Sequence, residues 1–268
     1  MDFTIKKYRE LLAAIVDAKY SFQTMEEFIS HPKSRVFVLR HDVDERPQNA
    51  LNLAKVESVL KIKSTYYFRI VKISNEPPII KEIADMGHEI GYHYEDYAAC
   101  HGDLEAAIAS FKNNLDYFRT YYPVNTICMH GSSMSMYDNR DMWKYHSLGD
   151  FDIIGEPYLS IDYSQVLYLT AGRSWDGARF NIRDTGGTIS LGHTFRSTSD
   201  IITTLKNEDM PDKVVLNTHT LWTDSMTEWV WLEVRELLRN NLKLLIYKSP
   251  VLKKYAYQVI QKYSNKFE

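Results

Sequence analysis

Two aspartates separated by one residue carry the strongest chemical signal in this chain of 268 residues. Asp42 and Asp44 follow an apolar run, Val36–Leu39, which is typical of a short buried strand. His41 precedes them, so three titratable groups lie within four residues. Enzymes with a parallel sheet place metal ligands and general bases at the C-terminal ends of its strands. We therefore expect a reaction centre at this strand end.

Three further predicted strands end in a histidine, namely His93, His130 and His219. The C-terminal ends of parallel barrel strands share one rim, so these histidines should meet Asp42 and Asp44. One aspartate and two histidines suit zinc or another first-row divalent ion. Such an ion activates water and polarises a carbonyl, while a nearby carboxylate and histidine move the protons. The set predicts amide hydrolysis.

Apolar runs alternate with helical periods along the chain, which predicts parallel βα units. We expect a distorted or incomplete (β/α) barrel of about seven parallel strands, in a single catalytic domain over residues 1–268. Candidate strands are Val36–Leu39, Ser64–Ile70, Glu89–His93, Asn125–His130, Phe151–Gly155, Val166–Thr170, Thr188–Phe195, Val214–Thr218 and Leu242–Tyr247. Three candidate helices span residues 5–19, 104–118 and 226–238. Two more begin at Pro47 and Pro77, and a lysine-rich helix closes the chain.

Four of these segments resemble motifs of the polysaccharide deacetylase superfamily, the nodulation-factor deacetylase homology domain. They follow the family order along roughly residues 35–225 and are Val38–Asp44, Ser64–Phe68, Gly87–His93 and Asn217–His219. The third, Gly-His-Glu-Ile-Gly-Tyr-His, is the most specific. The His-Asp-Val-Asp form, together with His130-Gly131-Ser132 and Trp143, is similar to a branch associated with surface-polysaccharide biosynthesis.

The resemblance implies one divalent metal and the hydrolysis of an acyl group on a sugar. Carried over by position, Asp42 matches the general base, Asp44 the metal carboxylate, His93 the first metal histidine and His219 the general acid. Val43 separates two acids that are adjacent in most members, so an alignment could exchange their roles. Alternation along an extended strand would point both acids to the same side.

The family's second metal histidine has no counterpart, because Tyr97 lies four residues after His93. We predict that His130 takes its place as a ligand, with Asp96 and water as the alternatives. Zinc is the expected metal, and iron, cobalt and nickel suit the same ligands.

Further residues are candidates for contacts around this centre. Arg173 and Trp175 could supply the family's Asp/Arg/Trp motif and bind substrate, and His193 is another candidate substrate contact. His41 could orient one of the aspartates.

Composition limits the partners that the protein is expected to bind and the cellular compartment in which it is expected to lie. The net charge is −3 and no basic run is flanked by aromatics, so nucleic acid is not an expected partner. The 19 Tyr and 5 Trp suit either a sugar pocket or core packing. Cys100 and Cys128 form no CxxC pattern, which is typical of buried thiols in a reducing compartment. Neither a signal peptide nor a membrane-spanning run is evident, so we expect a cytoplasmic protein.

Three functions are consistent with these features. The first is removal of an acetyl or formyl group from an amino sugar during surface-polysaccharide biosynthesis, with a small-molecule or lipid-linked sugar as substrate. The second is an amidase acting on a non-sugar or cyclic amide with the same scaffold. The third, favoured by the missing second histidine, is a barrel that binds sugar without turnover. The sequence leaves the acyl group, the sugar and the oligomeric state open.

Overall fold

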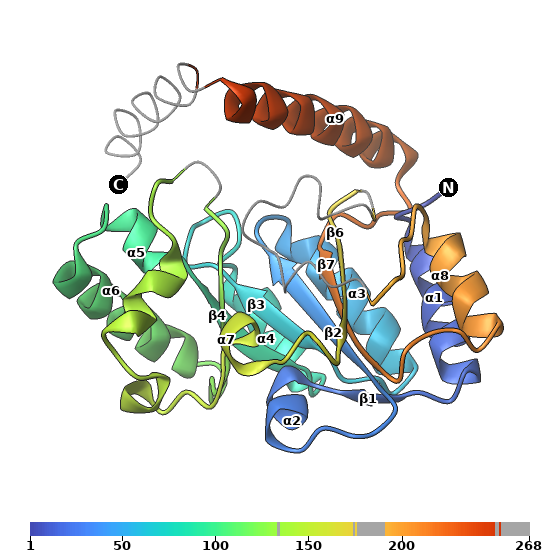
Figure 1. Ribbon diagram of the computed structural model, residues 1–268, viewed down its shortest axis with the longest axis horizontal. Coiled ribbons are helices and arrows are strands. Elements are labelled where there is room, and N and C mark those ends of the chain that lie inside the picture. Colours follow the sequence, from blue (N-terminus) through green and yellow to red (C-terminus); the bar gives the residue numbers. More distant parts are fainter. Residues whose placement is uncertain (133–134, 174, 176–190, 250–251, 253–268) are drawn as a thin grey trace.

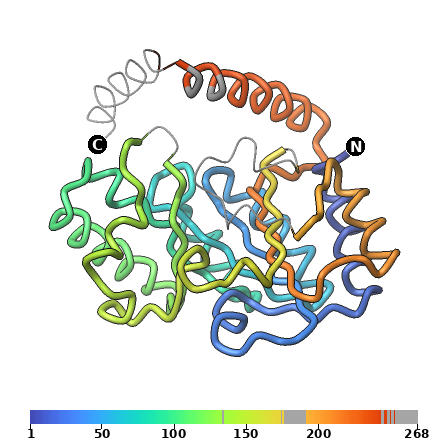
Figure 2. Tube along the Cα trace, viewed as in Figure 1, coloured from blue at the N-terminus to red at the C-terminus, as the bar shows by residue number. Residues whose placement is uncertain are grey.

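The computed structural model describes residues 1–132, 135–173, 175, 191–249 and 252. A curled sheet of parallel strands lies at its centre, with helices packed around it (Figures 1 and 2). The edge strands are β5 and β6, so the sheet is an open half-barrel. The expected distorted, incomplete (β/α) barrel of about seven parallel strands is confirmed.

The strands pair in the order β5-β4-β3-β2-β7-β6, with β1 beside the first half of β2. Every pair between named strands is parallel. Their bounds are β1 Ser21–Gln23, β2 Val36–Val43, β3 Thr65–Phe68, β4 Glu89–Tyr94, β5 Ile127–Met129, β6 Leu167–Ala171 and β7 Lys213–His219.

Helices cover the outer face of the sheet, because a parallel sheet is buried on both sides. The expected helix starts at Pro47 and Pro77 are confirmed. The longer helices are α1 Ile5–Asp17, α3 Pro47–Val59, α4 Pro77–Asp85, α6 Leu104–Arg119, α8 Thr198–Lys206 and α9 Met226–Lys248. The short ones are α2 Met25–Ser30, α5 Asp96–Ala99, α7 Pro157–Ser160 and the 3-10 turns η1 Asn139–Lys144 and η2 Leu148–Phe151.

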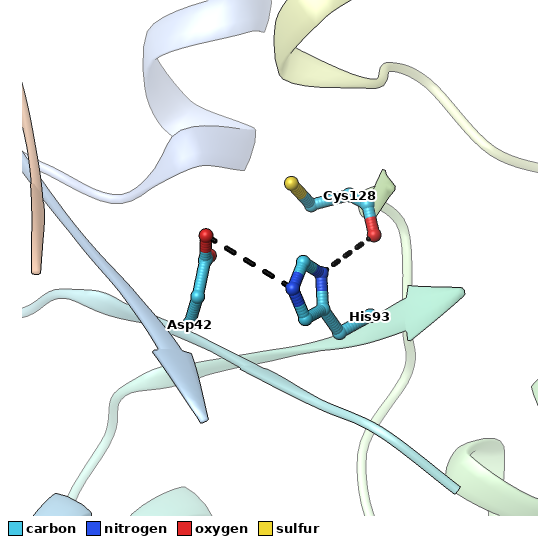
Figure 3. Close-up of side chains that lie close together, drawn as sticks. All are labelled: Asp42, His93 and Cys128. Atoms are coloured by element: carbon cyan, nitrogen blue, oxygen red, sulfur yellow. Dashed lines mark hydrogen bonds and ion pairs between the residues drawn. The ribbon is translucent and has the colours of Figure 1, made fainter. Parts of the chain in front are cut away.

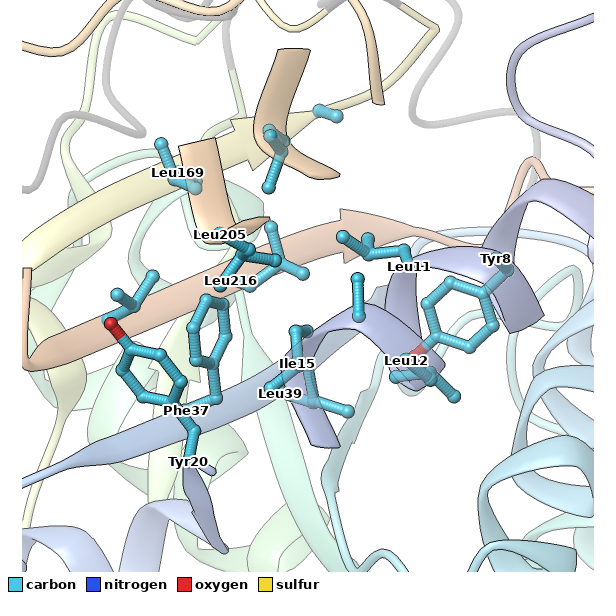
Figure 4. Close-up of a cluster of buried hydrophobic side chains, with 14 of the residues drawn as sticks. Tyr8, Leu11, Leu12, Ile15, Tyr20, Phe37, Leu39, Leu169, Leu205 and Leu216 are labelled. Atoms are coloured by element: carbon cyan, nitrogen blue, oxygen red, sulfur yellow. The ribbon is translucent and has the colours of Figure 1, made fainter. Parts of the chain in front are cut away.

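Side chains along β2 alternate between two separate cores. Phe37 and Leu39 point outward and pack with α1 and α8 (Figure 4). Val36 and Val38 point inward and pack with Met25 of α2 and with strand residues. The period of two along an extended strand produces this division. It also fixes which way the polar residues that follow in β2 will point.

Two predicted strands are wrong. Phe151–Gly155 contains the end of η2, and only Gly155 makes an isolated bridge, to Thr126. Leu242–Tyr247 belongs to α9, because the Arg-Asn-Asn run at 239–241 contains neither Gly nor Pro to end the preceding helix. Among the described residues, no helix has the length and apolar character needed to cross a membrane.

Other differences concern short or partly described segments. The strand β1 was not predicted, because three residues give too short a pattern to recognise. Part of the predicted strand Thr188–Phe195 lies outside the described residues, and residues 191–195 form a turn and an irregular segment. The predicted closing helix lies almost wholly outside the described residues.

Gly91 of β4 gives a test of how tightly the barrel interior is packed. A Cβ at this position would lie 2.3 Å from the Tyr67 ring and 2.9 Å from the Thr126 carbonyl oxygen. We predict that Gly91→Ala lowers the free energy of unfolding by about 1–3 kcal/mol, because neither neighbour can move freely. Urea unfolding measures the change. Gly149→Ala, whose Cβ would lie 3.5 Å from Ser147 Oγ, is the control and should change it far less; equal effects would contradict the packing argument.

Candidate metal centre

Five polar side chains meet where four parallel strands end. Asp42 and Asp44 come from the end of β2, and His93 lies near the end of β4. His130 follows β5 and His219 ends β7. In the sheet register Asp42 pairs with His219 and His93 pairs with Cys128, so the strand ends are level with one another.

The carboxylate of Asp44 faces three imidazoles. Its Oδ1 lies 3.3 Å from His93 Nε2 and 3.6 Å from His130 Nε2, and its Oδ2 lies 3.5 Å from His219 Nε2. Burial acts to raise the pKa of Asp44, but the positive charge that the three histidines carry when protonated lowers that pKa well below its usual value. Asp44 is therefore an anion at neutral pH.

Each histidine is held through its other ring nitrogen. His93 Nδ1 lies 2.9 Å from the Cys128 carbonyl oxygen, His130 Nδ1 lies 2.8 Å from Glu95 Oε2, and His219 Nδ1 lies 3.2 Å from the Ala171 carbonyl oxygen. These three partners are acceptors, so each Nδ1 carries the proton and donates it. In a neutral ring, Nε2 then carries no proton, and its lone pair is directed at Asp44. Metal-ligating histidines are oriented in this way.

The buried Asp44 Oδ1 is the clearest sign that a cation fits here. Among the described residues this oxygen has no hydrogen-bond partner. Ligand atoms arranged tetrahedrally about 2.1 Å from a zinc ion lie about 3.4 Å apart. The separations of Asp44 Oδ1 from His93 Nε2 and His130 Nε2 are close to that value. Asp44 Oδ1 therefore stands from each of these imidazoles at the separation expected of two ligands that share a zinc-like ion.

A second group shares His93. Ligand atoms of Asp42, His93 and Cys128 all lie within 4.8 Å of one another (Figure 3). The two oxygens of Asp42, however, accept hydrogen bonds from Arg40 Nε at 2.8 Å and Nη2 at 2.7 Å. A fixed guanidinium charge on that carboxylate opposes a cation at the same oxygens. The group around Asp44 is the better metal site.

Asp42 occupies a different environment from Asp44. Asn217 Nδ2 donates to it at 2.9 Å, in addition to the two bonds from Arg40. Burial acts to raise its pKa, but Arg40 first, and then His93, lower the pKa of Asp42 to about 2. Asp42 is therefore an anion held by Arg40 and Asn217, 4.0 Å from His93 Nε2 and beside the candidate metal ligands.

The predicted substrate contacts lie elsewhere in the described structure. Arg173 donates to the Leu221 carbonyl oxygen at 2.8 Å and pairs with Glu233 of α9. Trp175 is buried against Phe3 and Trp222. His193 stacks on Phe195. Their described contacts are thus with residues outside the group around Asp44.

Two other candidates point away from the centre. The Asp96 carboxylate accepts hydrogen bonds from Tyr92, Ser110 and Asn114 on the outer side of β4, so it does not supply the missing ligand. His41 lies on the outward face of β2 and contacts Glu57 and Thr218, not an aspartate.

Tyr97 packs edge-on against Tyr137. At the position of the missing histidine the chain therefore has an aromatic packing contact.

Arg40 and Glu95 contact residues of the candidate site, Asp42 and His130, and the sequence analysis missed both. Each lies two positions from a recognised residue, Arg40 before Asp42 and Glu95 after His93, so strand periodicity could have identified both. Arg69 also binds Glu95, with nitrogen–oxygen distances of 2.6–2.8 Å. Burial acts to raise the pKa of Glu95, but His130 and Arg69 lower that pKa to about 2.

Comparison with solved structures finds similar folds at low identity. A CE4 family pseudoenzyme from Bacillus anthracis is 15% identical, with a TM-score of 0.41, over 76% of this chain and 63% of that one. A mutant of this pseudoenzyme with restored enzymatic activity is 14% identical, with a TM-score of 0.42, over 77% and 65%. The present chain thus spans less than two thirds of those two chains.

The Xyl-CE4 domain of a multidomain xylanase from the hindgut metagenome of Trinervitermes trinervoides is also similar. It is 15% identical, with a TM-score of 0.35, over 78% of this chain and 85% of that domain. No family model and no curated protein matches the sequence.

Glu95 provides a test of how His130 is oriented. We predict that Glu95→Gln weakens zinc binding about 10–100-fold, because the carboxylate that holds the Nδ1 proton is lost. Zinc titration against a competing chelator measures the change. Glu105→Gln, on the exposed start of α6, is the control and should bind like the wild type. Unchanged affinity in Glu95→Gln would exclude His130 as a ligand oriented by Glu95.

Glu57 provides a test of the buried network behind the centre. Its carboxylate is fully buried and accepts from Tyr66 at 2.7 Å and pairs with His41 at 2.7 Å. Burial acts to raise its pKa, but His41 lowers the pKa of Glu57 to about 2. Breaking a buried pair costs about 3–5 kcal/mol, and we predict that loss for Glu57→Gln at pH 7.

The same shift predicts a pH dependence. A carboxylate with a lowered folded-state pKa contributes stability above pH 4.5 and loses it as the pH falls towards 2. The free energy of unfolding should therefore fall less steeply with acid in Glu57→Gln than in the wild type. Urea unfolding across this range gives the slopes. The control is Glu82→Gln, which breaks an exposed ion pair with Lys55 and should keep the wild-type slope of unfolding free energy against pH. A wild-type slope in Glu57→Gln would contradict the lowered pKa of Glu57.

Proposed function

We propose that this protein is a metal-dependent hydrolase that removes an N-acyl group, acetyl or formyl, from an amino sugar. The observation that carries the proposal is the convergence of three histidine Nε2 atoms on Asp44, next to the separate, arginine-anchored carboxylate of Asp42. The four strand-end motifs that resemble the polysaccharide deacetylase superfamily support it, and we propose membership of that superfamily. A role in surface-polysaccharide biosynthesis is part of the same proposal.

Different side chains would carry out the separate steps of amide hydrolysis. Asp44, His93 and His130 would hold the divalent ion, which when bound polarises the acyl carbonyl and acidifies water. Asp42 is ionised and would accept the proton of the attacking water. His219 would protonate the departing sugar amine from Nε2, while its Nδ1 stays bonded to the Ala171 carbonyl oxygen.

Arg40 sets the properties of the base. It keeps Asp42 oriented and ionised, so the carboxylate is ready to accept a proton at neutral pH. With a pKa of about 2, however, Asp42 is a weak base and would hold the proton only briefly. Transfer to His219, whose strand pairs with β2 at this level, would then restore the anion.

The weak base favours one alternative function. A carboxylate held on both oxygens by Arg40 can anchor a ligand without moving protons. A barrel that binds an amino sugar without turnover is therefore the second candidate, and turnover separates it from the first.

The test is release of acid from defined substrates. Zinc-loaded protein should liberate acetate or formate from N-acyl amino sugars linked to a nucleotide or a lipid, as measured by mass spectrometry. Asp42→Asn and His219→Ala should each lower the rate about 10²–10⁴-fold, the usual contribution of a general base or acid. His31→Ala, at the exposed C-terminal cap of α2, is the matched control and should retain activity.

The competing result is equally specific. A zinc-loaded protein that binds these sugars saturably and releases no acid from any of them would contradict the hydrolase and support the binding barrel.

A further inference from the structure

The helix α9 has its charged side towards the protein and its apolar side towards solvent. Glu228 pairs with Arg46, Glu233 with Arg173, and Arg235 with Glu45. Among the hydrophobic side chains of α9, the fully buried one within the described residues is Leu232. Helices on globular proteins show the opposite arrangement, with the apolar side on the core.

The outward side of α9 is a continuous apolar face. Its large hydrophobic side chains are 49–65% exposed and recur every three or four residues, so they lie along one side of the helix. Adjacent hydrophobic residues occur at two places two turns apart, Val230/Trp231 and Leu237/Leu238, which makes the face wider than the narrow seam of a two-stranded coiled coil. The members of this face are Met226, Val230, Trp231, Val234, Leu237, Leu238, Leu242 and Leu245.

Charge identifies the kind of surface that would cover this face. Residues 240–268 contain six Lys and one acid, Glu268, although the whole chain has a net charge of −3. The same stretch contains four Tyr and one Phe. A lysine-rich stretch with few acids that follows a leucine-rich helix is typical of chains that bind the surface of an anionic bilayer. The acids of α9 named above are already neutralised by arginines of the chain.

The position of α9 relates this face to the candidate metal centre. Arg235 of α9 binds Glu45, the residue directly after Asp44. Thr220, directly after His219, donates to the Glu45 carbonyl oxygen at 2.8 Å. Figure 1 shows α9 running across the molecule over the side on which β6 and β7 end. A flat surface that covered the apolar face of α9 would therefore lie on the same side as the rim of the site.

We propose that the outward face of α9 docks on the surface of an anionic lipid bilayer and that the substrate is an amino sugar carried on a membrane lipid. The docking rests on α9 and on the charge of the C-terminal residues, whereas the substrate class also rests on the proposed hydrolase function. Docking would hold the rim next to sugars at the bilayer surface and raise their local concentration.

Vesicle binding tests the docking. The full chain is sedimented with vesicles of phosphatidylcholine alone or mixed equally with phosphatidylglycerol. We expect binding to the anionic vesicles, weakened by added NaCl because surface charges are screened.

The double variant Leu237→Asp/Leu238→Asp should lower the partition coefficient at least about tenfold, since two apolar anchors are replaced by anions. The matched control is Val59→Asp/Ile73→Asp, at residues that are 83% and 61% exposed outside α9, and it should bind like the wild type.

Three results would overturn the docking. The wild-type chain could stay in solution with anionic vesicles, or the α9 variant could bind them as well as the wild type does. Light scattering could instead show that the wild type is a dimer and the α9 variant a monomer. The last would assign the face to a second copy of the chain.

Activity separates docking from the hydrolase function. The α9 variant should release acid at the wild-type rate from an N-acyl sugar nucleotide in solution, and at a lower rate from the same sugar on a polyprenyl lipid in anionic vesicles. Equal rates for both proteins on the vesicle substrate would overturn the role of docking in presenting that substrate, and release from the sugar nucleotide alone would overturn the assigned substrate class. No release by either protein on either substrate would refute the hydrolase function and leave the vesicle-binding result to stand by itself.

Discussion

The alternation of side chains along β2 is the constraint on which the site depends. Val36 and Val38 face the interior, so Arg40, Asp42 and the following Asp44 continue on that side. Arg40 is thereby placed to bind Asp42 through two nitrogens. A shift of one residue would reverse the whole series and bury the acids against the outer helices. The buried core thus determines the register that brings both carboxylates to the rim.

The two carboxylates acquire different properties from their neighbours. Asp42 faces a guanidinium that always carries its charge, whereas Asp44 faces three imidazoles whose protons are held elsewhere. The first arrangement satisfies an anion permanently. The second leaves an anion and lone pairs pointing at one another, which is stable when a cation lies between them. This difference favours Asp44 over Asp42 as the carboxylate that would hold a metal.

Much of this could be predicted from the sequence, and the failures have physical causes. Strand ends with Asp44, His93, His130 and His219 were recognisable because parallel strands share a rim. Asp96 was kept as an alternative to His130 because the sequence does not reveal that helix α6 supplies hydrogen bonds to its carboxylate. The end of α9 has apolar residues in direct succession at Leu244, Leu245 and Ile246, without the spacing of an amphipathic helix, so this run looked like a strand. Short apolar runs do not distinguish the two.

The most direct measurement is calorimetric zinc titration of the metal-free wild type, Asp44→Asn and Asp42→Asn. The account predicts one zinc ion per chain for the wild type and for Asp42→Asn, and loss of tight binding in Asp44→Asn, because Asp44 lies against the Nε2 atoms of both His93 and His130. Retention of zinc by Asp44→Asn with its loss from Asp42→Asn would contradict the account. It would place the metal in the group formed by Asp42, His93 and Cys128.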